Sequence, residues 1–228
     1  MKTSIQKVRR NDLVEAAFAT FLEYGLSGMT MARIGERAGM SHGIVNYYFK
    51  NKDQLLSEVV RKANYLIMQD VARRLREARS PRSRLSAVVI GNFPADLFTR
   101  NVARAWVSFY AAIGGMPEFE SLQVLVYRRL RSNLVATLKQ LTTAAEAERI
   151  ALGISVWIDG LWLRQATDRE AMTPESAIAA VEHYIDIALA SAPSCPSNRS
   201  AAPQRAARRK AGATARPPVK PQVKGRNR

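Results

Sequence analysis

Apolar residues recur along residues 1–192 with the three- to four-residue spacing of amphipathic helices, and no stretch alternates with the period of two that marks a strand. The first segment, from Ile5 to Tyr24, shows this pattern. Its apolar stripe comprises Leu13, Ala16, Ala17, Phe21 and Tyr24. Gly25 follows the stripe and is expected to end the helix. The pattern as a whole predicts an all-α protein.

Two short helices are predicted next. Thr30 is a good N-cap for a helix that runs through Ala38, and Ser41 caps a second helix that ends before Lys50. The turn between them contains Gly39, at a position where a tight turn needs left-handed backbone. Two short helices joined in this way are typical of a helix-turn-helix.

The two short helices divide into a buried and an exposed side. Ile34 and Ala38 are expected to face Ile44 or Val45, and Phe49 is assigned wholly to the core. The side chains left outside are polar, small or aromatic: Ser41, His42, Gly43, Asn46, Tyr47 and Tyr48. Such a surface suits the major groove of DNA, although any small helical domain can show the same spacing.

The rest of the apolar pattern predicts further helices over Gln54–Ala78, Arg84–Asn92, Ala95–Ile113, Phe119–Leu141, Ala144–Thr167 and Pro174–Ser191. After Ser191 the composition changes to Pro, Ala, Ser, Arg and Lys, which predicts a disordered basic tail over residues 193–228. The expected organisation is a helix-turn-helix DNA-binding domain over residues 1–52 and a helical ligand-binding and dimerisation domain over residues 53–192, followed by the tail.

Charge is distributed unevenly along the 228 residues, whose formal net charge is +16. Residues 1–79 carry 14 Lys and Arg against 8 Asp and Glu, residues 80–192 carry 11 of each, and residues 193–228 carry 10 basic residues and no acidic one. A basic head beside a neutral middle indicates that the head binds a polyanion. A basic surface that only aids solubility is the alternative.

Other features narrow the class of function. The two histidines and the single Cys195 offer no metal-ligand spacing, and no nucleophile motif or phosphate loop occurs, so neither an enzyme nor a cofactor or metal is expected. No run approaches the roughly 18 apolar residues of a membrane span. The polar segment from Met1 to Asp12 does not read as a signal peptide. A cytoplasmic protein without a membrane partner is therefore expected.

The DNA-binding signature of the TetR family closely resembles three stretches of this chain: Thr30-Met-Ala-Arg-Ile-Gly-Glu-Arg-Ala-Gly39, Ser41-His-Gly43 and Tyr48-Phe-Lys-Asn-Lys52. About ten positions agree in type and spacing. The resemblance implies a three-helix DNA-binding domain, a long fourth helix that joins it to a ligand domain, and a homodimer on operator DNA.

The resemblance also implies roles for single residues. Base edges would be contacted by His42, Gly43, Asn46 and Tyr47. Phosphates would be contacted by Thr30, Ser41, Tyr48 and Lys52. Arg33 is a candidate for either role. The alternatives are a solvated helix start for His42, a packing aromatic for Tyr47 and a solvated charge for Lys52.

Large aromatic side chains are concentrated in the neutral middle of the chain. Four residues at i, i+3, i+4 and i+7 share one helix face: Trp106, Phe109, Tyr110 and Ile113. On a later helix Asp159 lies between Trp157 and Trp162. Ring faces beside a carboxylate suit a quaternary ammonium ion, which the rings attract without N–H donors. Ordinary core packing of the aromatics is the alternative.

Four stretches of this region are similar to the choline-responsive repressors of glycine-betaine synthesis genes: Gly91-Asn-Phe93, Arg104-Ala-Trp106 with Phe109, Arg128-Arg-Leu-Arg-Ser-Asn-Leu134 and Trp157-Ile-Asp-Gly-Leu-Trp-Leu-Arg164. The similarity covers about residues 1–190. It implies repression of the genes that convert choline to betaine, relieved by choline. Two departures border the expected pocket: Tyr110, where relatives often carry Trp, and Gly115, in place of a frequent His.

The resemblance leads to an expected ligand site. Its aromatic cage comprises Trp106, Phe109, Tyr110 and Trp157. Asp159 supplies the counter-charge or, as the alternative, pairs with an arginine such as Arg164 or Arg104. Trp162 belongs either to the cage or to the core. Choline would favour an arrangement in which the two reading heads no longer match the operator spacing.

The last predicted helix carries an apolar stripe of Ile178, Val181, Ile185 and Leu189. Together with the preceding helix it is the expected dimer surface, with burial inside one subunit as the alternative. Three readings compete with the choline-responsive repressor: a TetR-type repressor for another cation or hydrophobe, a non-specific nucleoid-type DNA binder, and a helical enzyme. The nucleoid-type reading accounts for the basic tail but not for a neutral domain rich in aromatics.

Overall fold

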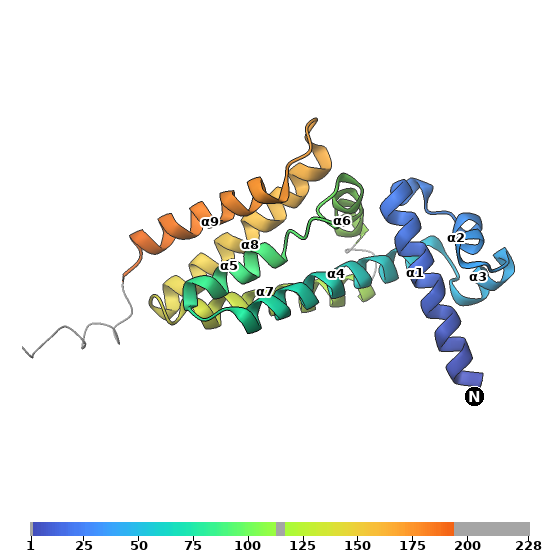
Figure 1. The fold of residues 1–228 in the computed structure, drawn as a ribbon, viewed down its shortest axis with the longest axis horizontal. Coiled ribbons are helices and arrows are strands. Elements are labelled where there is room, and N and C mark those ends of the chain that lie inside the picture. Colours follow the sequence, from blue (N-terminus) through green and yellow to red (C-terminus); the bar gives the residue numbers. More distant parts are fainter. Residues whose placement is uncertain (1, 113–116, 194–228) are drawn as a thin grey trace, which may run out of the picture. The chain divides into compact units, whose positions relative to one another are not determined.

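The computed structural model describes residues 2–112 and 117–193. Within these ranges the regular elements are helices, arranged as Figure 1 shows, and no strand occurs. Their bounds are α1 (Lys2–Gly28), α2 (Met31–Ala38), α3 (His42–Tyr48), α4 (Lys52–Glu77), α5 (Pro81–Gly91), α6 (Arg100–Ala112), α7 (Pro117–Leu138), α8 (Ala144–Thr167) and α9 (Pro174–Ser191). The all-α prediction is confirmed. Gly115, Cys195 and the tail beyond residue 193 lie outside the described residues.

Two predicted helix starts are wrong. The helix expected from Arg84 begins at Pro81, with Ser80 as its N-cap, and the helix expected from Ala95 begins at Arg100. Leu97 and Phe98 both donate their backbone N–H groups to the carbonyl oxygen of Pro94, at 3.0 and 2.8 Å, and this turn delays the helix. By contrast, α8 and α9 begin and end at the predicted residues.

Local signals account for the first three helices. α1 changes direction at Gly25, whose φ of 68° lies in the left-handed region. The side-chain oxygens of Thr30 and Ser41 cap α2 and α3 by accepting backbone N–H bonds at 3.3 and 3.4 Å. Gly39 ends α2 with φ 63°, a conformation that a residue with a side chain adopts only at a cost. The predicted caps and turn are therefore confirmed.

Helices α1, α2 and α3, called the head below, enclose an apolar core. Leu13, Phe21, Ile34, Val45 and Phe49 are buried there. The core assignment of Phe49 is thus confirmed, and Val45 is the residue of α3 that turns inward. The expectation that Tyr24 also faces inward is wrong: its ring is exposed, and the Arg33 guanidinium lies 4.4 Å from its centre.

Helices α4 to α9 form the helical body of the protein (Figure 1). α8 packs against α6, α7 and α9, and α4 packs against α5, α6 and α7. Head and body share a continuous core, because α1 packs against both α4 and α6. At that junction Asn101 of α6 donates its side-chain amide to the carbonyl oxygen of Leu22, at 3.1 Å. None of the described helices has the length and apolarity that a membrane span requires.

The apolar stripe on α9 faces the interior of the subunit. Val181 and Ile185 are fully buried, and Ile178 and Leu189 are partly buried against the same core. The expectation that this stripe forms the dimer surface is therefore wrong, and burial inside one subunit is confirmed.

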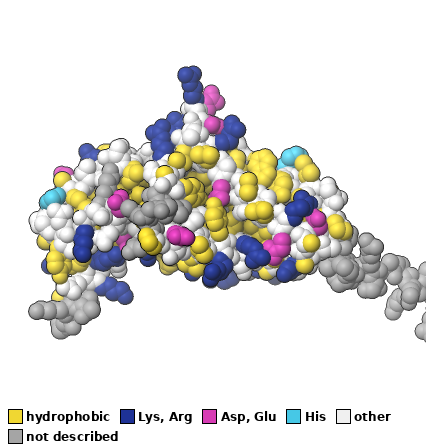
Figure 2. Space-filling view, turned by 180° about the vertical axis from the view of Figure 1, so that it is seen from behind, with side chains coloured by type: hydrophobic (Ala, Val, Ile, Leu, Met, Phe, Trp, Pro, Cys, Tyr) yellow, Lys and Arg dark blue, Asp and Glu magenta, His cyan; other side chains and the backbone are white. Residues whose placement is uncertain are grey.

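A different apolar surface is exposed, on α8 and α9. It comprises Leu152, Val156, Trp157 and Leu163 of α8 and Ile187 of α9. Leu152, Val156 and Leu163 are spaced by four and seven residues, so they share one face of α8. Figure 2 shows apolar side chains gathered across the middle of one face of the molecule.

Candidate functional site

The first candidate site is the outer surface of α3. Val45 anchors this helix in the core and leaves its other side to solvent. His42, Gly43, Asn46 and Tyr47 are exposed there, with Tyr47 72% exposed. The Asn46 amide nitrogen lies 3.1 Å from His42 Nδ1. The Tyr47 ring packs edge-on against Tyr48, with ring centres 5.2 Å apart. Hydrogen-bonding and aromatic groups are thus presented outward on one short helix.

The candidate phosphate contacts lie at helix ends: Thr30, Ser41 and Lys52 at the starts of α2, α3 and α4, and Tyr48 at the end of α3. Thr30 and Ser41 use their hydroxyl oxygens as acceptors in the caps of α2 and α3, which leaves the hydroxyl hydrogens to donate to an anion. Tyr48 is half-buried. The side chain of Lys52 lies outside the part of the chain that the structure describes in full.

Arg33 is already engaged within the head. Its Nη1 donates to the carbonyl oxygen of Gly28 at 2.8 Å, and its guanidinium covers the Tyr24 ring. The side chain therefore joins α2 to the end of α1, and this use of the guanidinium speaks against a free role on DNA.

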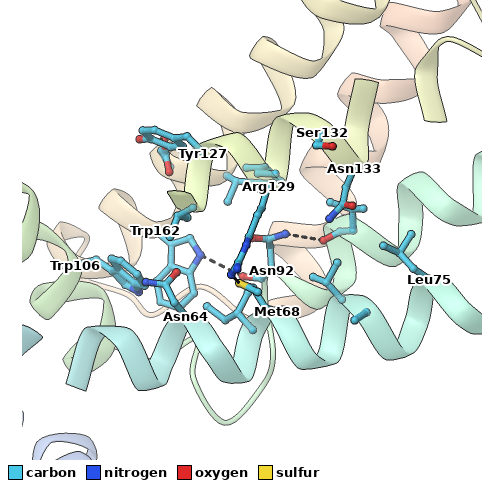
Figure 3. A pocket seen from close by; sticks show the side chains of 18 of the residues that line it. Asn64, Met68, Leu75, Asn92, Trp106, Tyr127, Arg129, Ser132, Asn133 and Trp162 are labelled. Carbon is cyan, nitrogen blue, oxygen red and sulfur yellow. Dashed lines mark hydrogen bonds between the residues drawn. The ribbon is translucent and has the colours of Figure 1, made fainter. Parts of the chain in front are cut away.

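The second candidate site is a cavity of about 340 Å³ inside the helical body. Five helices, α4 to α8, contribute side chains to its wall. Figure 3 shows most of them: Trp106, Tyr127 and Trp162 lie toward one side, Ser132 and Asn133 toward the other, and the Arg129 side chain lies between the two groups. Of the expected ligand residues, Trp106, Tyr110, Asp159 and Trp162 line this cavity.

Asp159 is held by two tyrosines. Tyr127 donates its hydroxyl to one carboxylate oxygen at 2.6 Å, and Tyr110 donates to the other at 3.3 Å. Burial raises the pKa of Asp159 above the usual carboxyl value, and the two tyrosine bonds only partly offset this. Burial and the nearby carboxylate raise the pKa of Tyr127 to about 12, so its hydroxyl is protonated at neutral pH.

No arginine neutralises Asp159 among the described residues. Arg164 pairs with Asp168 at 3.0 Å, and Arg104 donates to the carbonyl oxygen of Ala166 at 3.4 Å. The alternative role of Asp159 in an ion pair with either arginine is therefore wrong. Its carboxylate is available to a cation in the cavity.

The aromatic wall consists of rings from α6 and α8. The Trp106 ring centre lies 6.0 Å from that of Tyr110 and 6.4 Å from that of Trp162. Trp162 also donates its indole N–H to the carbonyl oxygen of Asn92, at 3.2 Å. This bond fixes the orientation of the indole, so Trp162 is part of the cavity wall and of the packed interior at once.

Two expected members of the cage do not line the cavity. Phe109 is fully buried behind it, with its ring centre 4.9 Å from that of Phe119. Trp157 is 42% exposed and packs against Tyr184 of α9, with ring centres 6.0 Å apart. A helix turns about 100° per residue, so two residues of separation place Trp157 roughly opposite Asp159. Placing both in the cage is therefore wrong.

Several cavity residues were not among the sequence-predicted site. Tyr127 and Arg129 come from α7, Asn64 and Met68 from α4, and Asn92 from the end of α5. Asn64 could have been found from the sequence, because it is a polar residue on the apolar side of α4. The structure shows that it is buried. Tyr127 had none, because its partner Asp159 is 32 residues away in the sequence.

Family comparisons agree with this architecture. Residues 81–190 match the family described as BetI-type transcriptional repressor, C-terminal, and residues 13–59 match bacterial regulatory proteins of the tetR family. The HTH-type transcriptional regulator BetI of Paraburkholderia xenovorans is 39% identical over 191 residues, which are 83% of this chain and 98% of that protein. The chain belongs to the TetR family and is of BetI type. BetI of Brucella melitensis biotype 2 is 36% identical to this regulator over 193 residues, 85% of this chain and 98% of that protein.

Solved structures show the same fold. A transcriptional regulator from Pseudomonas aeruginosa PAO1 is 27% identical to the BetI-type regulator, with a TM-score of 0.64 over 81% of this chain and 92% of that chain. A regulator from Saccharomonospora viridis, solved in complex with choline, is 20% identical, with a TM-score of 0.66 over 78% of this chain and 95% of that chain. The protein is thus a helix-turn-helix transcriptional repressor and not an enzyme.

Proposed function

We propose that this regulator represses the genes that convert choline to glycine betaine and leaves its operator when choline fills the cavity. The observation that carries the proposal is Asp159, a carboxylate with no arginine partner among the described residues, beside the rings of Trp106, Tyr110 and Trp162. Ring faces attract a trimethylammonium group by about 0.5–2 kcal/mol each when water is excluded, and the carboxylate adds its charge. BetI relatives and a choline-bound structural neighbour support this ligand.

Two helices, α4 and α6, connect the cavity to the head and can transmit the effect of a bound ligand. α6 carries Trp106 and Tyr110 and also holds α1 through the bond from Asn101 to Leu22. α4 lines the cavity and begins directly after α3. Choline would favour the arrangement of these helices that suits the cavity over the one that suits the operator. The loss of DNA affinity is limited to the difference in choline affinity between the two arrangements.

Choline release is tested with a duplex selected from random DNA by repeated binding to the full chain. In a gel shift, choline should release the wild type, whereas glycine betaine should do so poorly, since its carboxylate lies close to Asp159. Trp106→Ala should lower the affinity for choline by about 5- to 30-fold through loss of one cation–π contact, and it should leave DNA binding intact. Tyr65→Ala is the matched control, because this exposed ring lies on α4 outside the cavity. A wild type that ignores choline would refute the proposed ligand.

The DNA contacts assigned to α3 lead to a separate prediction. Tyr47→Ala should lower affinity for the selected duplex by about 10-fold and barely change affinity for random DNA, since a base contact carries specificity and a phosphate contact does not. Tyr65→Ala, which removes another exposed tyrosine from α4, is the control. The measurement is fluorescence anisotropy with both duplexes at physiological salt. Equal losses on both duplexes would mean that Tyr47 does not contact bases.

A further inference from the structure

The cavity has a second end of opposite charge to Asp159. Arg129, Ser132 and Asn133 all line it and stand at i, i+3 and i+4, so they share one face of α7. Figure 3 shows Ser132 and Asn133 on the side away from Trp106, with the Arg129 side chain between them and Trp162. The Arg129 side chain extends toward α4 and brings Nη1 to 2.7 Å from Met68 Sδ. A positive charge therefore lies at the α4 wall. Arg129 and Ser132 are both exposed, so this end of the cavity opens to solvent.

The hydrogen-bond partner of Arg129 is a poor acceptor. A thioether sulfur is a weak hydrogen-bond acceptor, and a guanidinium carries five N–H donors. Two other arginines pair with acids: Arg131 on the same helix with Glu148, and Arg164 on α8 with Asp168. Among the described residues no carboxylate pairs with Arg129. Its donors remain available to an anionic group that enters the cavity.

The two ends together describe a ligand with two charges. Asp159 and the rings accept a quaternary ammonium group. Arg129, the Ser132 hydroxyl and the Asn133 amide offer the forked and single donors that bind a carboxylate or phosphate. Choline, which has no anionic group, satisfies only the first end and brings a like charge into a cavity that contains Arg129.

Resting on the proposed function of the cavity as the inducer site, we infer that its preferred ligand is a zwitterionic quaternary ammonium compound. The ammonium group lies at Trp106 and Asp159, and a carboxylate or phosphate lies at Arg129, Ser132 and Asn133. The two charges must be several bonds apart. Glycine betaine has one carbon between them, so an ammonium group at Asp159 brings the carboxylate close to the Asp159 carboxylate, which repels it.

The test measures calorimetric binding of choline, phosphocholine, carnitine and glycine betaine to the full chain. Phosphocholine or carnitine should bind about 3- to 10-fold more tightly than choline, as expected for charge-assisted bonds at an exposed guanidinium, and the stronger of the two identifies the anionic group. Arg129→Gln should abolish this preference and should bind choline at least as tightly as wild type does, because a like charge is removed. Arg128→Gln, at a neighbouring position that does not line the cavity, should change the affinity for neither ligand.

Opposite effects of Arg129→Gln on the two ligands separate a binding role from a structural one. If the affinity of the variant falls equally for choline and for the zwitterion and its melting temperature also falls, Arg129 is a structural residue and the inference is overturned. If wild type binds choline more tightly than both longer zwitterions, the inference fails while the choline proposal stands. If the zwitterions bind and choline does not, the inference stands and the choline proposal fails.

Discussion

Val156→Arg is expected to disrupt the homodimer that we propose to form through the exposed apolar surface of α8 and α9, and to lower the affinity for the selected duplex by about 10²- to 10⁴-fold. Val156 is 60% exposed on α8, with Leu152 66% exposed one turn earlier on the same face. Apolar patches of this kind mark interaction surfaces, and a two-fold axis would place the new charge in the interface twice. A monomer loses the gain in effective concentration that links two reading heads on one operator.

The dimer prediction is checked by light scattering after size-exclusion chromatography and by gel shift at the same concentrations. Val124→Arg is the matched control, because Val124 is an exposed valine on α7 outside the apolar surface of α8 and α9. It should remain a dimer with wild-type affinity. If Val124→Arg dissociates the dimer and Val156→Arg does not, the subunits meet on another face.

The sequence predicts correctly those features of the fold that depend on interactions between residues only a few positions apart. The caps of α2 and α3, the left-handed turn at Gly39 and the bounds of α8 and α9 depend on local hydrogen bonds and backbone preferences. The turn after Pro94 was missed because an apolar pattern continues through residues that are not helical. Periodicity records which side of a segment is buried, even where the backbone has not yet begun a helix.

Periodicity does not record what covers the buried side. The stripe of Val181 and Ile185 on α9 has the spacing of an interface, yet it packs inside the subunit. In the same way Trp157 is close to Asp159 in sequence but faces α9, whereas Tyr127 is distant in sequence and bonds to Asp159. Which residues meet in the cavity depends on the packing of five helices, which no single segment specifies.

Asp159→Asn is expected to lower choline affinity by about 10-fold and to stabilise the free protein. An ionised carboxylate next to a cation, at an effective dielectric between that of protein and water, contributes about 1–2 kcal/mol after the cost of desolvation. Asparagine keeps a similar shape, and its amide can still hydrogen-bond to Tyr127 and Tyr110. The charge is therefore the main property that the substitution removes.

The pH dependence follows from the raised pKa of Asp159. Because the folded protein binds this proton more tightly than the unfolded chain does, the stability contributed by protonated Asp159 is complete below the unfolded pKa and is lost as pH rises through the folded pKa. Asp159→Asn removes this loss, so its melting temperature should exceed that of wild type at pH 7. Choline needs the ionised form, and its affinity for wild type should fall as pH drops through the raised pKa.

Calorimetric titrations from pH 4 to pH 7, with thermal unfolding at each pH, test both effects. Glu148→Gln is the matched control, because it removes a carboxylate from the surface of α8 outside the cavity. In Asp159→Asn the pH dependence of choline binding should largely disappear, and glycine betaine should gain affinity because the repulsion of its carboxylate is removed. A variant that binds choline like wild type and still rejects glycine betaine would show that Asp159 only positions Tyr110 and Tyr127. In that case the aromatic rings alone would hold the cation.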